Sequence, residues 1–194
     1  MASPIDVVRH TESNHIVSKD FCQLDPSVTQ LGLRQAAQLI QTFPDPSSIA
    51  IILTSTLKRA IQTTLAGFPY VEMSALPCGT RSDRDVLEKA FPRLYFGGLA
   101  EAWQWKEGLY SAGNVAVEER PTRVRRGLAE LSEQLKDNER NGIVVVKHGG
   151  FVKFLSEDRE IDLSKAVWKS YTVAKDNGGE FMLIPVETTI DAKP

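Results

Sequence analysis

The sequence predicts an α/β protein, a three-layer α/β/α sandwich with a mostly parallel, mixed sheet. Short strand-like runs alternate with amphipathic segments along the chain, which is the order typical of parallel strands joined by helices. Near the end, Asp-Asn-Gly-Gly at residues 176–179 separates two strand-like runs and indicates an antiparallel hairpin. A chain of 194 residues can bury one good-sized core, so we expect a single domain over residues 1–194.

Residue patterning predicts the elements of the first half of the chain. Runs of strand-forming residues predict strands at Ile5–Arg9, Ile49–Thr54 and Tyr70–Met73. A polar loop is expected to follow the first strand through Pro26. Apolar residues at helical spacing predict helices over residues 28–42 and 57–66, with a shorter helix over 83–89.

The second half begins with residues 93–115, which hold two tryptophans and several glycines and are expected to be irregular. Because proline suits the first turn of a helix, Pro121 is expected to open a long amphipathic helix that ends near Asn138. After it we expect a strand at Ile143–Val146 and a short helix from Gly150. The two hairpin strands are expected at Ser170–Ala174 and Glu180–Pro185.

Composition argues against several classes of partner. The net charge of −2 provides no basic field for nucleic acid or for anionic lipid. No apolar stretch approaches the roughly 20 residues that span a bilayer, and the first residues lack the pattern of a signal peptide. The two cysteines, Cys22 and Cys78, form no CxxC and have no ligand-like spacing to a histidine. We therefore expect a cytoplasmic protein with no metal and no cofactor.

Two short segments far apart in the chain each end a hydrophobic run with a histidine. The first is Ile-Asp-Val-Val-Arg-His at residues 5–10, and the second is Ile-Val-Val-Val-Lys-His at residues 143–148. Ligands bind at the carboxyl edge of the strands in open α/β sheets. Two of the chain's three histidines, His10 and His148, are thus predicted to share one active site.

The residues beside these histidines suggest phosphoryl chemistry. A neutral imidazole can attack phosphorus and carry the phosphoryl group as phosphohistidine, provided that cations hold the phosphoryl oxygens. Arg9 is one such donor, and Arg59, one turn into the helix after the second strand, is expected to point back toward the same edge. A single histidine or arginine near a strand end more often has a structural role. The combination and order of the motifs carry the prediction.

On these motifs the chain resembles the histidine phosphatase superfamily, in its phosphoglycerate mutase-like branch, and is similar to a fungal-type subgroup of it. Val8-Arg9-His10 stands at the Arg-His-Gly signature. Asp25 to Ala36 is similar to the Asp-Pro-x-Leu-Thr-x-x-Gly-x-x-Gln helix start. Ser55 to Thr63 resembles Ser-Pro-Leu-x-Arg-Ala-x-Gln-Thr, and Val146 to Phe151 resembles the second-histidine motif. The likeness covers nearly the whole chain and implies a phosphoglycerate mutase-like fold.

The resemblance also implies roles. His10 would be the nucleophile, while Arg9, Arg59 and His148 would form the phosphate pocket and a carboxylic acid would protonate the leaving group. The register of the likeness assigns that acid to Glu72, with Asp83, Glu12 and Glu88 as alternatives. Ser13 and Gly149, which follow the two histidines in the chain, complete the predicted substrate-binding set.

Two positions depart from the pattern of the family. Ile16 stands where an asparagine commonly donates to the phosphate, and its side chain has nothing to donate. Asn14 or His15 could take that place if the loop moves. Lys147 replaces a small residue before His148. A lysine there could bind a second phosphate or a carboxylate, or it could lie over the neighbouring helix. We include Lys147 among the substrate-binding residues.

Three functions follow from the sequence. The first is a metal-independent phosphatase that hydrolyses a phosphate ester through a phosphohistidine on His10. The second keeps the fold but isomerises, cyclises or dehydrates an anionic or carbonyl-containing metabolite, for instance in secondary metabolism, with His10 or His148 as the acid–base group. The third is a catalytically weak binding module. The expected partners are a small anionic substrate and a second copy of the chain in a homodimer.

Overall fold

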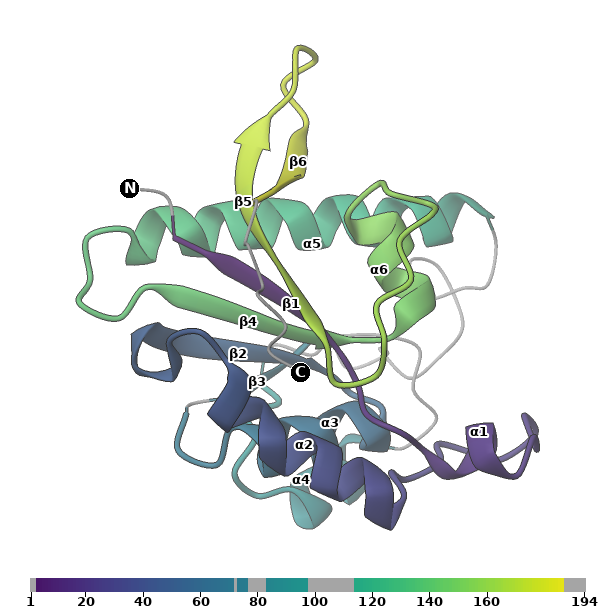
Figure 1. The fold of residues 1–194 in the computed structure, drawn as a ribbon. Helices are drawn as coiled ribbons and strands as arrows, with labels where there is room; N and C mark the ends of the chain where they lie inside the picture. The colour runs from purple at the N-terminus through teal and green to yellow at the C-terminus, as the bar shows by residue number, and fades with distance from the viewer. Residues whose placement is uncertain (1–2, 72, 77–82, 98–113, 187–194) are drawn as a thin grey trace.

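The computed structural model describes residues 3–71, 73–76, 83–97 and 114–186. Its centre is a six-stranded mixed sheet with the strand order β3-β2-β4-β1-β5-β6 (Figure 1). Four strands run parallel, namely β1 (Ile5–Arg9), β2 (Ile49–Ser55), β3 (Met73–Leu76) and β4 (Gly142–Lys147). The antiparallel pair is β5 (Trp168–Lys175) and β6 (Phe181–Pro185), which confirms the hairpin.

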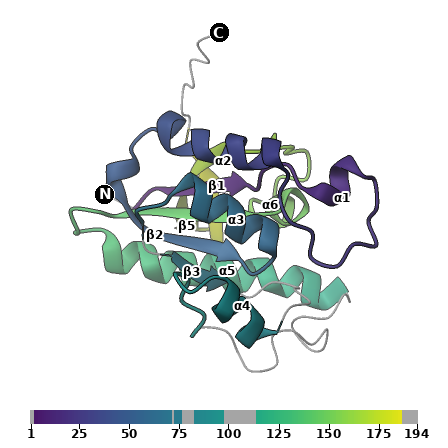
Figure 2. The same cartoon turned by 90° about the horizontal axis from the view of Figure 1, so that it is seen from below.

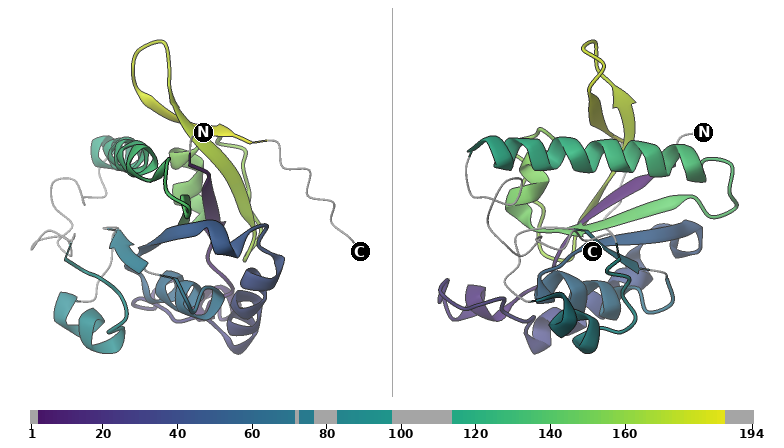
Figure 3. Two further views of the ribbon diagram at one scale, coloured as in Figure 1. Left: turned by 90° about the vertical axis from the view of Figure 1, so that its left-hand side faces the viewer. Right: turned by 180° about the vertical axis from the view of Figure 1, so that it is seen from behind.

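Helices cover both faces of this sheet and confirm the three-layer sandwich. On one face lie α2 (Gln30–Thr42), α3 (Lys58–Gly67) and α4 (Arg84–Ala90), with α2 and α3 side by side (Figure 2). On the other face lie α5 (Asn114–Leu135) and α6 (Gly149–Leu155), as the left-hand view in Figure 3 shows. A short helix, α1 (Asn14–Val17), follows β1, and a single 3₁₀ turn at Pro46–Ser48 precedes β2.

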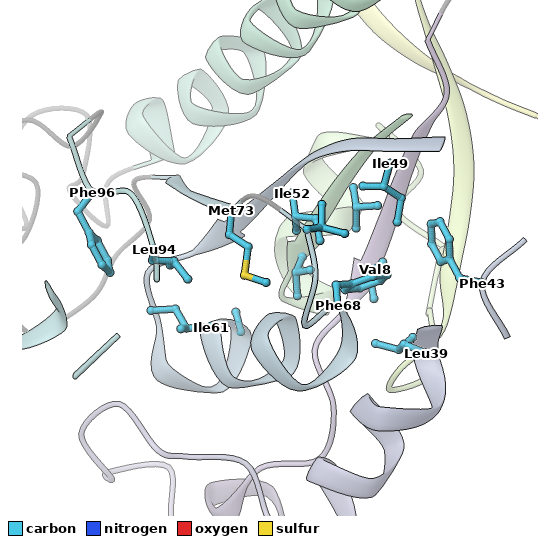
Figure 4. Packing of buried hydrophobic residues seen from close by; sticks show 14 of the residues in the cluster. Val8, Leu39, Phe43, Ile49, Ile52, Ile61, Phe68, Met73, Leu94 and Phe96 are labelled. Carbon is cyan, nitrogen blue, oxygen red and sulfur yellow. The ribbon is translucent and has the colours of Figure 1, made fainter. Parts of the chain in front are cut away.

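The strand alternation divides the core into two halves. Val8, Val144 and Val146 pack with the α2 and α3 side, in the cluster shown in Figure 4. Their neighbours Val7 and Val145 pack with the α5 and α6 side. Because side chains alternate between the faces of a strand, residues two further along keep the same face. Arg9 and Lys147, which are paired in the register of β1 and β4, therefore point to the α6 side of the sheet.

The long helix begins earlier than predicted. Helix α5 starts at Asn114, so Pro121 lies inside it rather than at its first turn. A proline in this position removes one backbone hydrogen bond of the helix. An ion pair between Glu119 and Arg123 at 2.7 Å spans the proline, and Leu128 further along is buried in the core. The helix therefore continues through a residue that propensity alone places at its start.

The third strand lies three residues later than predicted, at Met73–Leu76 rather than at Tyr70–Met73. After α3 ends, Phe68 is buried in the core and Val71 N donates to Phe68 O in a turn that leaves Tyr70 exposed. The chain therefore reaches its register with β2 only at Met73, which pairs with Ile52. None of the helices in the described ranges is both long enough and apolar enough to cross a membrane.

Candidate active site

The two histidines of the motifs lie together at the carboxyl edge of the sheet. Strands β1 and β4 are adjacent and parallel, and His10 and His148 are the residues that follow them. The ring centroids are 5.0 Å apart, and the ring planes meet at 61°. His10 N also donates to Lys147 O at 3.0 Å, which extends the pairing of the two strands by one bond. One tetrahedral anion is small enough to contact both rings.

The His10 ring has a defined tautomer. Its Nδ1 lies 2.7 Å from Thr11 O, and because a carbonyl oxygen can only accept, Nδ1 carries the hydrogen. The lone pair of the neutral ring is then on Nε2. Thr11 is held in turn by Thr63, whose hydroxyl accepts from Thr11 N at 3.1 Å. Burial, together with the positive charges of Arg59 and Arg9, lowers the pKa of His10 to about 4, so the ring is neutral at pH 7.

His148 has one nitrogen engaged and one without a partner. Nε2 lies 2.8 Å from the hydroxyl of Ser55, at the end of β2. Nδ1 is buried and has no hydrogen-bond partner among the described residues. Burial, then His10 and Arg59, lower the pKa of His148 well below its usual value, so this ring is neutral as well. The sequence motif included Ser55, but nothing in it showed that the hydroxyl reaches a histidine 93 residues away.

Arg9 is anchored at one corner of its guanidinium group. Nη1 donates to Asp162 Oδ1 at 2.9 Å and to Leu163 O, while Nε is buried without a partner among the described residues. The guanidinium lies over Gly149, where an added Cβ would be 3.1 Å from Arg9 Cζ. Gly149 thus makes room for Arg9, a role that its place in the sequence did not reveal. Asp162 was missed because no pattern connects it with β1.

Arg59 lies where the sequence placed it, in the first turn of α3. Asp25 accepts a hydrogen bond from Lys58 N at 2.8 Å and so binds the start of this helix. The charge of Arg59 acts on the rings of His10 and His148, whose pKa values it lowers. The second guanidinium group therefore belongs to the same site as the two histidines.

Lys147 is nearly inaccessible, with 1 % of its surface exposed. Its Nζ lies 5.0 Å from the centroid of the Phe151 ring in α6, which is a cation–π geometry. Of the two positions predicted for this side chain, the one over the neighbouring helix is observed. Its positive charge still contributes to the lowered pKa of His148.

The third histidine, His15, which is one of the two residues expected to take the place of the missing asparagine donor, also lies at this site. Ser13 is buried and precedes α1, and its Oγ is 3.2 Å from Nδ1 of His15. Burial and then the charges of Arg59 and Lys165 lower the pKa of His15. The signal was the spacing, since a short helix after β1 keeps a residue five positions beyond His10 near the strand end. Ile16 is exposed on the same helix.

The predicted general acid, Glu72, lies outside the described residues. Among the alternatives, Glu12 accepts from the Thr29 hydroxyl at 2.7 Å, and its other oxygen is 3.7 Å from Lys165 Nζ. Glu88 forms an ion pair with Arg84 at 2.7 Å, and Asp83 is exposed just before α4. Across the described ranges, no three His, Cys, Asp or Glu side chains gather in a way that would hold a metal ion.

Comparison with known proteins agrees with this geometry. The model of the histidine phosphatase superfamily (branch 1) matches residues 5–76. This segment includes β1, β2 and α3, which carry His10, Ser55 and Arg59. The match covers less than half of the chain, and over the rest of the chain the likeness is one of fold. No curated protein matches the sequence.

Several solved structures share the fold over almost their whole length. A mycobacterial glucosyl-3-phosphoglycerate phosphatase is 17 % identical with a TM-score of 0.61, over 94 % of this chain and 97 % of that one. A phosphoserine phosphatase from Entamoeba histolytica is 18 % identical with a TM-score of 0.58, over 96 % and 98 %. The α-ribazole phosphatase from Shigella flexneri is 19 % identical with a TM-score of 0.55, over 95 % and 96 %. At these identities the likeness establishes the fold.

Proposed function

We propose that this protein is a metal-independent phosphatase that hydrolyses a phosphate ester through a phosphohistidine on His10. One observation carries the proposal. The hydrogen on Nδ1 of His10 is committed to Thr11 O, which leaves the Nε2 lone pair as the nucleophile. The lowered pKa keeps that lone pair unprotonated at neutral pH. The phosphatases among the solved structures with this fold support the proposal.

The neighbouring groups suit the phosphoryl oxygens. Arg9 Nε and His148 Nδ1 are buried nitrogens without partners among the described residues, and such groups are costly unless a ligand satisfies them. A phosphoryl group has acceptor oxygens for both, and Arg59 supplies a further positive charge. This pairing favours phosphoryl transfer over the isomerase, cyclase or dehydratase alternative, for which no comparable feature is seen in the described part of the chain.

The hydroxyl of Ser55 fixes the tautomer of His148 so that its ring can donate to the phosphoryl group. When the Ser55 hydroxyl donates to Nε2 of His148, the single hydrogen of the neutral ring lies on Nδ1. His148 then donates to the phosphoryl group while His10 attacks it. The two histidines therefore act with opposite tautomers. Lys147, buried beside them, contributes positive charge rather than a direct contact.

The reaction proceeds in two steps. In the first, Nε2 of His10 forms a bond to phosphorus, the bond from phosphorus to the ester oxygen breaks, and an acid gives that oxygen its proton. In the second, water attacks phosphorus and the N–P bond breaks. The electron pair of that bond returns to Nε2, and the carboxylate formed in the first step takes the proton of the water. We assign the acid to Glu72 on the resemblance alone.

Narrower features of the function are also proposals. The similarity to a fungal-type subgroup, a cytoplasmic location and a homodimer rest on the sequence arguments above. The substrate is proposed to be a small phosphate monoester, with Ser13 and Gly149 near the bound phosphoryl group through their contacts with His15 and Arg9.

The decisive experiment traps the intermediate. The enzyme is mixed with an aryl phosphate in the presence of a chelator, quenched in base, and mapped by mass spectrometry. We expect released phosphate and a phosphoryl group on His10, and neither in His10→Ala. Replacing Cys22, an exposed residue, with serine is the matched control and should change nothing. Phosphate release that persists in His10→Ala, or a different phosphorylated residue, would refute the mechanism.

A further inference from the structure

The segment that follows β1 exposes four large apolar side chains near the active site, of which Ile16 is the least exposed at 38 %. Val17 is 60 % exposed, Phe21 73 % and Leu24 66 %. They lie on α1 and the loop after it, which leave the carboxyl end of β1 (Figure 1). Single exposed apolar residues are ordinary, but these three lie within eight residues of one segment. We call Val17, Phe21 and Leu24 the apolar rim.

Phe21 connects the apolar rim to the proposed phosphate pocket through His15. One end of this contact is polar, because Nδ1 of His15 lies 3.2 Å from the hydroxyl of the buried Ser13. The other end is apolar, because the rings of His15 and Phe21 meet edge to face with centroids 6.0 Å apart. A molecule whose anionic end lies among the histidines therefore meets the apolar rim on the side of His15.

Three side chains suit a small ligand better than a second protein. An aromatic side chain buries roughly 150–250 Å² in full, so the apolar rim offers no more than a few hundred Å². A stable protein interface needs about 800 Å² from each partner. The body of one organic ligand buries an area of the size that the rim offers.

From this geometry we propose that the natural substrates are phosphate monoesters of apolar alcohols or phenols. The phosphoryl group lies in the histidine pocket, and the alkyl or aromatic body of the leaving group lies against the apolar rim. This inference rests on the proposed phosphatase function and names the substrate class of the same site.

The test is a series of n-alkyl phosphates from ethyl to octyl, with kcat/KM measured for each. Burial of a methylene predicts a gain of roughly two- to four-fold per added carbon until the rim is covered. The ratio of octyl to ethyl phosphate should fall by about ten-fold or more in the double variant Phe21→Ser, Leu24→Ser. Ile184→Ser, which replaces an exposed apolar residue on β6, is the control and should keep the ratio.

Two results would overturn the inference while the phosphatase mechanism stands. One is phosphate release that does not depend on chain length. The other is an unchanged ratio in the double variant, with a loss of dimer in size-exclusion chromatography, which would assign the apolar rim to contact between two copies. Absence of phosphate release from every ester, with no phosphohistidine, would instead refute the proposed function and this inference with it.

Discussion

Replacing Gly149 with alanine tests the placement of Arg9 with a single methyl group. The new Cβ would lie 3.1 Å from both Cζ and Nε of Arg9, whereas ordinary contacts begin at 3.4 Å, so the guanidinium must move by a few tenths of an ångström. Its Nη1 is held by Asp162 and Leu163, so the movement falls on the unpartnered Nε that we assign to the phosphoryl group. A misplacement of about 1 Å can cost about 100-fold in rate. We therefore expect kcat/KM to fall by about 3- to 10-fold.

The neighbouring glycine provides a matched control. Gly150 is the second residue of α6, and a Cβ added there meets nothing within 4 Å. Alanine at Gly150 is expected to stabilise the helix by up to about 1 kcal/mol, whereas at Gly149 the close contact with Arg9 opposes that gain. Urea unfolding of both variants and initial rates on an aryl phosphate separate the two effects. If Gly149→Ala and Gly150→Ala have equal kcat/KM, the proposed contact between Arg9 Nε and the phosphoryl group is wrong.

Three further predictions concern the histidines and a buried carboxyl. Ser55→Ala should lower kcat by about 5- to 150-fold, because a hydrogen bond to a half-buried ring is worth about 1–3 kcal/mol. Ser55→Thr should recover part of the rate, and a wild-type rate in Ser55→Ala would exclude a role for the hydroxyl. Because the pKa of His10 falls from 6.5 to about 4 on folding, its contribution to the free energy of unfolding should be complete above about pH 6.5 and should decline by about 3 kcal/mol as the pH falls from 6.5 to 4. If the urea midpoints of wild type and His10→Asn depend on pH in the same way, this prediction is wrong. Burial raises the pKa of Asp6, while the hydrogen bond from Ser170 opposes the shift, so Asp6→Asn should raise the urea midpoint at pH 8. The difference between the variant and wild type should shrink as acid protonates the wild-type carboxyl, and a lower midpoint for the variant at pH 8 would contradict the prediction.

The errors in the predicted fold have a common origin. Local patterns located most strands within a residue or two, because a buried strand needs an unbroken apolar run wherever it lies. They misplaced β3 and the start of α5, where Tyr70 and Pro121 have clear local preferences that packing overrides. Register between strands depends on the path of the chain after the preceding helix, and this path is absent from a local window of sequence.

The sequence by itself determined the order of strands and helices and the convergence of His10, His148, Arg9 and Arg59, because residues that end parallel neighbouring strands must meet at one edge. Only the tertiary structure decided what those side chains bond to. Asp162 reaches Arg9 from 153 residues away and Ser55 reaches His148 from 93, and His15 joins them through a short helix. Lys147 turned toward α6. Periodicity states which residues share a face of an element, whereas hydrogen-bond partners depend on how distant loops return to that face.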